Sequence, residues 1–167
     1  MQGGNNSFYA GGFAGRISGI TISGCSSTSP VNVEGSGIVY VGGFAGQVND
    51  AVISGCSSIN PVSGSGGVYA GGFAGQINSS EIKDCFSRSP LRAFNNGNEG
   101  SVYAGGFAGS IEAESTVYRC YAAGIVNSLS RGEFDLGSLH YTGGFVGMIK
   151  VPLLSKLKSL PVMHHAA

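Results

Sequence analysis

Few side chains in this 167-residue sequence have the type and spacing that a catalytic site needs. Its histidines, His140, His164 and His165, have no glutamate at the spacing of a His-Glu-x-x-His zinc site, and no Gly-x-Ser-x-Gly element supports a serine nucleophile. Carboxylates and cations cluster at residues 83–92 and 131–135, a combination that polysaccharide-cleaving enzymes place on one face. A solvated polar loop is the simpler interpretation of each cluster, so we expect no enzyme activity, no metal site and no cofactor.

The best candidates for surface recognition lie in and near two long segments between repeats. Residues 92–101 and 127–140 mix aromatic side chains with arginine, asparagine and aspartate. Insertions in a repeat protein fall on one edge of the stack, which often binds partners. The candidates for a binding edge, for a glycan or a protein, are therefore Arg88, Arg92, Phe94, Asn95, Arg131, Phe134 and Asp135. Tolerated drift in loop length is the simpler explanation of the same insertions.

An internal repeat must position these candidates. The heptapeptide Tyr-Ala-Gly-Gly-Phe-Ala-Gly, or a close variant, occurs five times, 29 to 38 residues apart. A period in this range is typical of solenoids and propellers, in which each unit buries its apolar face against its neighbours. Propeller blades need about 40–50 residues, so the shorter spacing favours a solenoid. The repeats begin at Tyr9, Tyr40, Tyr69, Tyr103 and Tyr141.

The repeats consist of short segments rich in valine, isoleucine, tyrosine and serine, punctuated by glycine and asparagine, without helical periodicity. We therefore predict an all-β fold, a parallel β-solenoid (β-helix) of about four to five coils over residues 1–149, with three strands per coil. Residues 150–167 leave the repeat. Leucines at near-helical spacing between Pro152 and Pro161 predict a short helical or irregular C-terminal cap, or a tail.

A second column of the repeat is formed by four cysteines, each 16 or 17 residues after its tyrosine: Cys25, Cys56, Cys85 and Cys120. In a solenoid these positions stack about 4.8 Å apart, with parallel side chains that suit the torsion of a disulfide poorly. We expect reduced, buried thiols rather than disulfides. An apolar residue lies three positions before each cysteine, so both point inward only if the chain bends between them, near Gly24 and Gly55.

The two-residue period of a strand assigns faces to the heptapeptide segment. We expect the face with Tyr40 and Phe44 inside the coil, where the rings of successive repeats stack. Val39, Val41 and Ala45 share the other face, which ends in a polar residue in most repeats. We therefore predict that these three form a flat apolar strip on the outside, used for self-association or for binding a protein partner.

The run Gly-Gly-Phe-Ala-Gly, followed about nine residues later by Ile-x-x-Cys-x-Ser, resembles the bacterial GLUG motif. Residues 117–123 (Val-Tyr-Arg-Cys-Tyr-Ala-Ala) and 143–147 (Gly-Gly-Phe-Val-Gly) come nearest to it, and the resemblance covers about residues 9–149. The chain differs from the motif in using phenylalanine for leucine and in lacking asparagine before cysteine. Such repeats occur in large bacterial surface proteins, adhesins and the non-catalytic portions of immunoglobulin A1-cleaving metalloproteases. The resemblance implies a β-solenoid at the cell surface or outside the cell.

The composition of the chain argues against several classes of function. Charged residues make up 11% of the chain and balance to zero, unlike the basic stripe of a nucleic-acid binder. No apolar run reaches membrane-spanning length, and residues 1–8 lack the features of a secretory signal. We expect a non-catalytic structural or interaction module of a surface or extracellular protein, adhesin-like or assembly-forming. A carbohydrate-binding or polysaccharide-processing β-helix protein that uses the long-loop edge is the alternative.

Overall fold

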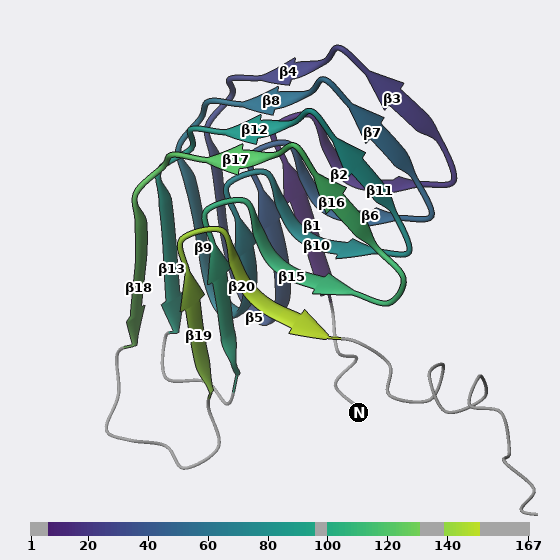
Figure 1. The fold of residues 1–167 in the computed structure, drawn as a ribbon. Coiled ribbons are helices and arrows are strands. Elements are labelled where there is room, and N and C mark those ends of the chain that lie inside the picture. Colours follow the sequence, from purple (N-terminus) through teal and green to yellow (C-terminus); the bar gives the residue numbers. More distant parts are fainter. Residues whose placement is uncertain (1–6, 96–99, 131–138, 151–167) are drawn as a thin grey trace, which may run out of the picture.

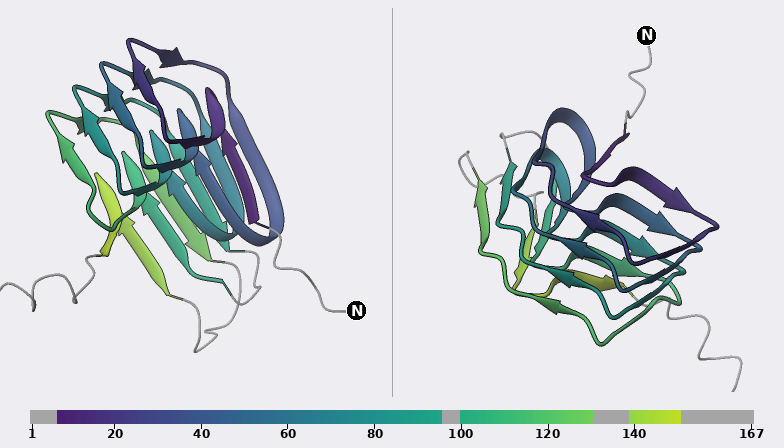
Figure 2. Two further views of the ribbon diagram at one scale, coloured as in Figure 1. Left: turned by 90° about the vertical axis from the view of Figure 1, so that its right-hand side faces the viewer. Right: turned by 90° about the horizontal axis from the view of Figure 1, so that it is seen from above.

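A computed structural model of the chain describes residues 7–95, 100–130 and 139–150. It is an all-β parallel β-solenoid of about four coils, which confirms the predicted fold class, and the described residues contain no helix. Figure 1 shows the coils as arched layers, one behind the next, and Figure 2 shows the same layers from the side and from above. The predicted cap over residues 151–167 lies outside the described residues.

Each coil has five extended segments rather than the predicted three, because the chain bends within the first two predicted segments. We name the segments, in chain order, the Tyr, Phe, Ile, Ser and Val strands. The first coil contains β1 (Ser7–Gly11), β2 (Ala14–Ser18), β3 (Thr21–Ser23), β4 (Ser26–Ser27) and the start of β5 (Val31–Gly42). β5 curves round to become the Tyr strand of the second coil, which continues with β6 (Ala45–Asn49), β7 (Val52–Ser54), β8 (Ser57–Ser58) and β9 (Val62–Gly71).

The third coil begins with the end of β9 and continues with β10 (Ala74–Asn78), β11 (Glu81–Lys83), β12 (Phe86–Ser87) and β13 (Leu91–Asn95). The fourth contains β14 (Val102–Gly105), β15 (Ala108–Glu112), β16 (Thr116–Tyr118), β17 (Tyr121–Ala122) and β18 (Val126–Ser130). β19 (His140–Gly143) and β20 (Val146–Lys150) begin a fifth. Corresponding strands pair in parallel through the stack, for example β2-β6-β10-β15-β20, so each residue lies beside its repeat equivalent.

Two apolar cores run along the stack. The first, the aromatic core, lies between the Phe, Ile and Ser strands and contains columns of phenylalanine, isoleucine or valine, and cysteine. Phe44, Phe73 and Phe107 are fully buried, and the five phenylalanine rings stack with centroids 4.6–4.9 Å apart, as predicted. The second, the valine core, lies between the Val strand and the Tyr strand and contains valine, alanine and leucine.

A polar waist separates the two cores. Here the Gly-Gly bend after each Tyr strand approaches the Ser strand so closely that a Cβ on Gly72 would lie 2.3 Å from Ser87 Oγ and 2.1 Å from Gly106 O. Buried side chains bond to the bend: Ser58 Oγ donates to Gly72 O at 2.7 Å, and Asn60 Nδ2 donates to Gly43 O at 3.1 Å. Both carbonyl groups also accept a backbone N–H of the neighbouring row, from Gly43 N at 3.1 Å and from Gly12 N at 3.2 Å, so the side chains supply a second hydrogen bond to each.

The predicted outer strip of Val39, Val41 and Ala45 is wrong. All three side chains are fully buried, the valines in the valine core and the alanine in the aromatic core. The chain bends between β5 and β6, so the two-residue alternation restarts within the heptapeptide and residues on both sides of the bend face a core. The tyrosines, predicted inside, lie on the opposite face of the Tyr strands as a partly exposed stack with centroids 4.6–5.3 Å apart.

The cysteine column agrees with its prediction. All four thiols are free; Cys56 and Cys85 are buried, and the two outer ones are half-buried. Cys56 N donates to Cys85 Sγ at 3.3 Å, and burial raises the pKa of the Cys56 thiol. The bend that turns isoleucine and cysteine inward together is present, since Gly24 and Gly55 have φ of 66° and 61°.

Candidate interaction surface

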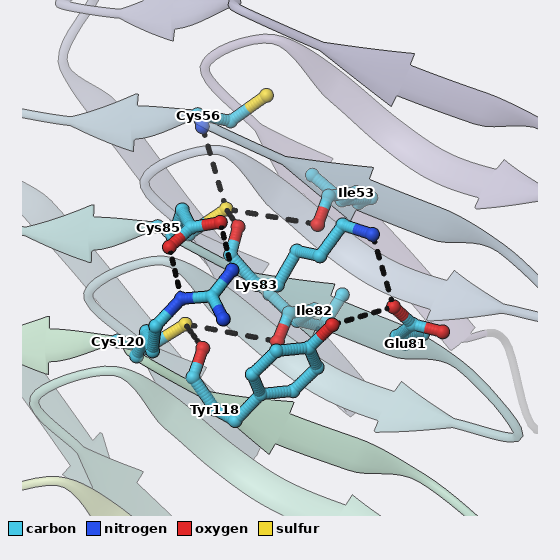
Figure 3. Close-up of polar contacts among 10 residues, drawn as sticks. Ile53, Cys56, Glu81, Ile82, Lys83, Cys85, Tyr118 and Cys120 are labelled. Atoms are coloured by element: carbon cyan, nitrogen blue, oxygen red, sulfur yellow. Dashed lines mark hydrogen bonds and ion pairs between the residues drawn. The ribbon is translucent and has the colours of Figure 1, made fainter.

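The outward side chains of the third and fourth coils form a patch that the first two coils lack. It lies on the Ile and Ser strands, on the side of each strand opposite the aromatic core, and part of it is shown in Figure 3. We call it the outer patch. Its members are Glu81, Lys83, Asp84, Phe86, Arg88, Tyr118, Arg119 and Tyr121.

Glu81 is the centre of one half of the patch. Tyr118 OH donates to Glu81 Oε1 at 2.9 Å, and Lys83 Nζ lies 3.3 Å from the same oxygen. Figure 3 shows both groups directed at this carboxylate, Tyr118 from the neighbouring coil and Lys83 from the same strand. The hydrogen bond from Tyr118 and the ammonium of Lys83 lower the pKa of Glu81, and the bond to Glu81 raises the pKa of Lys83.

The corner between the Ile and Ser strands holds an ion pair. Arg119 Nε and Nη2 donate to the two oxygens of Asp84, each at 2.6 Å. The guanidinium also lies over the Tyr118 ring, with Cζ 4.9 Å from the centroid, an arrangement that adds cation–π attraction. The hydrogen bonds from Arg119 lower the pKa of Asp84, and both residues adopt the left-handed backbone of the bend, with φ of 53° and 51°.

Phe86 and Tyr121 form an aromatic platform on the Ser strands. Their rings stack with centroids 5.1 Å apart and planes inclined by 4°. Arg88 lies beside both rings, with Cζ 5.4 Å from the Phe86 centroid, and its Nη2 donates to Tyr121 OH at 3.3 Å. Tyr121 is 44% exposed, so the platform offers apolar surface flanked by a cation.

At the equivalent positions of the first two coils, the side chains are small or apolar. Glu81 pairs in register with Val52, Lys83 with Ser54, and Phe86 with Ser57. One coil further, the residues at these positions are Thr21, Ser23 and Ser26. Since these coils have the same backbone and the same inner columns, the fold does not require the outer patch.

The sequence-predicted binding residues do not come together as expected. Arg88 belongs to the outer patch, whereas Arg92 and Phe94 line a hollow of about 780 Å³ between β13, β18 and β19. Asn95 was predicted at the surface but is 2% exposed; its Nδ2 donates to Gly100 O at 2.8 Å, so this amide bridges the two ends of its loop. Arg131, Phe134 and Asp135 lie outside the described residues.

Sequence reasoning also missed most of the patch, including Tyr118 and Tyr121. The signal was present, because alignment of the repeats shows aromatic and charged residues where earlier repeats have serine and threonine. Loop length instead drew attention to the edge of the coil that carries the long segments between repeats.

Within residues 7–95, 100–130 and 139–150, no three His, Cys, Asp or Glu side chains lie close enough together to hold a metal ion. Nor does this part of the chain contain a helix of the length and apolarity that crosses a bilayer. Comparison of the whole sequence and structure with protein-family models, with curated proteins and with solved structures finds no match.

Proposed function

We propose that the chain is a non-catalytic interaction module, adhesin-like, whose outer patch binds a partner. The observation that carries this proposal is the difference between coils at equivalent positions. Two coils build the solenoid with serine, threonine, valine and isoleucine on the outer face, and the next two replace them with tyrosine, phenylalanine, arginine and paired charges. Side chains that the fold does not require are available for recognition.

The chemistry of the patch suits a protein partner. Tyrosine and arginine are enriched among the residues that dominate binding energy at protein interfaces. Here carboxylates of the neighbouring coil hold them in place, through the Tyr118–Glu81 bond and the Arg119–Asp84 pair. Fixing these long side chains before binding lowers the entropy lost on association, which is about 0.5–1.5 kcal/mol per ordered side chain.

A surface or extracellular location rests on the similarity of the repeats to GLUG-type sequences. A module of this kind presents a rigid stack, and its ligands contact the outer faces of the coils rather than a deep cleft. The uniform inner columns give that rigidity, because each ring and each aliphatic side chain packs on its equivalent in the next coil.

Glycan binding is a second candidate, favoured by the Phe86–Tyr121 platform beside Arg88. Exposed aromatic rings and a flanking guanidinium can contact the apolar face and the polar substituents of a sugar. Glycan cleavage is not favoured at this site. A glycosidase needs a carboxylic acid whose pKa is raised, whereas both patch carboxyls have lowered pKa values and stay ionised at neutral pH.

The test converts the patch into the surface of the earlier coils. A quadruple variant, Phe86→Ser, Arg88→Thr, Tyr118→Ser and Tyr121→Ser, gives the third and fourth coils the side chains found at the equivalent positions of the first coil, Ser26, Thr28 and Ser23. Its control carries Thr21→Ala, Ser26→Ala and Ser57→Ala on the outer face of the first two coils. Both variants and the wild type are immobilised and probed with purified extracellular-matrix proteins, with a glycan array and with polysaccharide substrates.

We expect the wild type and the control to bind the same ligand, and the quadruple variant to lose at least tenfold in affinity, the factor for about 1.4 kcal/mol. Equal binding by the quadruple variant would show that recognition lies elsewhere. Product release from a polysaccharide would contradict the non-catalytic proposal.

A further inference from the structure

The two ends of the described stack carry most of its exposed apolar surface. Of the twelve large hydrophobic side chains that are well exposed among the described residues, four lie in the first coil, three in the fourth coil and three in the β19–β20 row. Phe13 is 46% exposed at one end and Ile149 is 68% exposed at the other. Within the described residues, β1 and β2 each have a neighbour on one side only, and so do β19 and β20. Both ends therefore present strand edges next to apolar side chains.

The two ends are complementary in residue type. If β1 and β2 of a second copy continued the stack beyond β19 and β20, Tyr9 would lie on Tyr141, Phe13 on Phe145 and Ile17 on Ile149. These are the contacts that the molecule already makes four times, with tyrosine and phenylalanine centroids 4.6–5.3 Å apart. In direct register neither cation would face another charge, because Arg16 would face Met148 and Lys150 would face Ser18.

Gly144 gives independent support for an occupant of the next row. At the equivalent position of the inner coils, a Cβ would collide with the glycine carbonyl of the following row. For Gly43 that carbonyl would lie at 2.2 Å, for Gly72 at 2.1 Å and for Gly106 at 2.2 Å. At Gly144 a Cβ would meet no described atom within 4 Å. The steric reason for glycine in the inner rows therefore applies at Gly144 if a further row stacks on the bend.

We propose that copies of this chain associate head to tail, with the β1–β2 edge of one copy pairing in parallel register with the β19–β20 edge of another. The contact joins two different surfaces and does not close on itself, so it generates linear filaments. It uses strands outside the outer patch and stands apart from the proposed function. A filament would repeat the patch at regular intervals and bind a multivalent partner with higher avidity.

The junction is small. β1 and β2 contain ten residues and β19 and β20 nine, compared with the roughly 20–30 residues a side of a standard interface. We therefore expect weak, concentration-dependent association, and sedimentation velocity over about 10 µM to 1 mM covers the affinities that small interfaces give.

Two variants block one edge each. Gly144→Ala places a methyl group where the second copy's Gly12 carbonyl would lie, without touching any described atom of its own chain. Phe13→Lys removes the exposed ring of the opposite edge and replaces it with a charge. Urea unfolding and circular dichroism report whether each variant is folded, and the quadruple outer-patch variant is the control for association.

We expect the wild type and the outer-patch variant to form species that grow with concentration, and each edge variant alone to stay monomeric. An equimolar mixture of the two edge variants should form a dimer and nothing larger, because each retains the edge that the other has lost. A monomeric wild type at 1 mM would overturn the proposal and indicate that something other than a second copy covers these edges. Growth of Gly144→Ala like the wild type, or a mixture that stays monomeric, would overturn it as well.

Discussion

The second and third coils have the same interior and different exteriors. Inside, Phe44 matches Phe73, and Cys56 matches Cys85. Outside, Ser57 is replaced by Phe86 in the same strand register. In a parallel stack each inner side chain packs on its equivalents above and below, so a change in one row must suit two others. An outward side chain has no such constraint, and the difference between coils therefore separates residues that maintain the fold from residues free to serve recognition.

The largest expected effect is on an inner ring. Phe73 stacks on Phe44 and Phe107, with centroids 4.8 Å away on both sides, and is fully buried. Phe73→Ala should therefore lower the free energy of unfolding by about 3–5 kcal/mol, measured by urea denaturation. Phe13→Ala is the matched control, because that ring is stacked on one side only and is 46% exposed. A loss below about 1 kcal/mol for Phe73→Ala would mean that the aromatic core does not carry the stability of the stack.

A smaller effect is expected at the polar waist. A Cβ on Gly72 would lie 2.1 Å from Gly106 O and 2.3 Å from Ser87 Oγ, so Gly72→Ala forces the bend and the Ser strand apart. We expect a loss of about 1–3 kcal/mol, the usual cost of overpacking. Gly144→Ala introduces the same atom where no described neighbour exists and should change the stability of the monomer by less than about 0.5 kcal/mol. Equal effects of the two substitutions would show that backbone flexibility, and not close approach, requires these glycines.

The repeat made the fold predictable. Five heptapeptides and four equally placed cysteines determine the coil number, the parallel register and the inward phenylalanine column. The orientation of the Tyr strand was not predictable from strand periodicity, because the Gly-Gly bend interrupts it and lets Val41 and Phe44 both face a core. The division into two cores also arises from this bend, whose close contacts depend on serine and asparagine side chains distant in sequence.

The outer patch was less predictable, for a different reason. Its pairs join neighbouring coils, as in Arg119 with Asp84, which are 35 residues apart. Such pairs can be predicted only after the register between the coils is known. Once the register is applied, a residue such as Tyr121 stands out by differing from Ser57 and Ser26 at a position where the backbone is the same.

The next expected effect concerns the outer aromatic platform. Phe86→Ser with Tyr121→Ser removes one stacked pair at a half-exposed site, so we expect a loss of about 0.5–1.5 kcal/mol in unfolding free energy. The first two coils fold with serine at both positions, which is why the expected loss is well below that of Phe73→Ala. If the two losses were equal, the contrast between inner and outer residues would fail, and the platform would belong to the structural framework.

The smallest expected effect is a pH-dependent one at the corner of the third coil. The hydrogen bonds from Arg119 lower the pKa of Asp84, so its carboxylate stabilises the fold at pH values above the unfolded pKa of about 3.9. That contribution disappears as the pH falls through the folded pKa, because the protonated acid no longer pairs with the guanidinium. Asp84→Asn keeps the size and tolerates the left-handed φ of 53° but cannot ionise.

We expect Asp84→Asn to have a slightly lower urea midpoint than the wild type at pH 7, and the difference to shrink as the pH is lowered through the folded pKa of Asp84. The control is Gly55→Asn, at the equivalent corner of the second coil, where φ is 61° and no carboxylate is removed. Its effect on the midpoint should not depend on pH in this range. A difference for Asp84→Asn that persisted at low pH would mean that the shape of this corner, rather than its charge, stabilises the third coil. The corner would then be required for the fold, like the inner columns. The paired charges of the outer patch could no longer be taken as residues that the fold does not require.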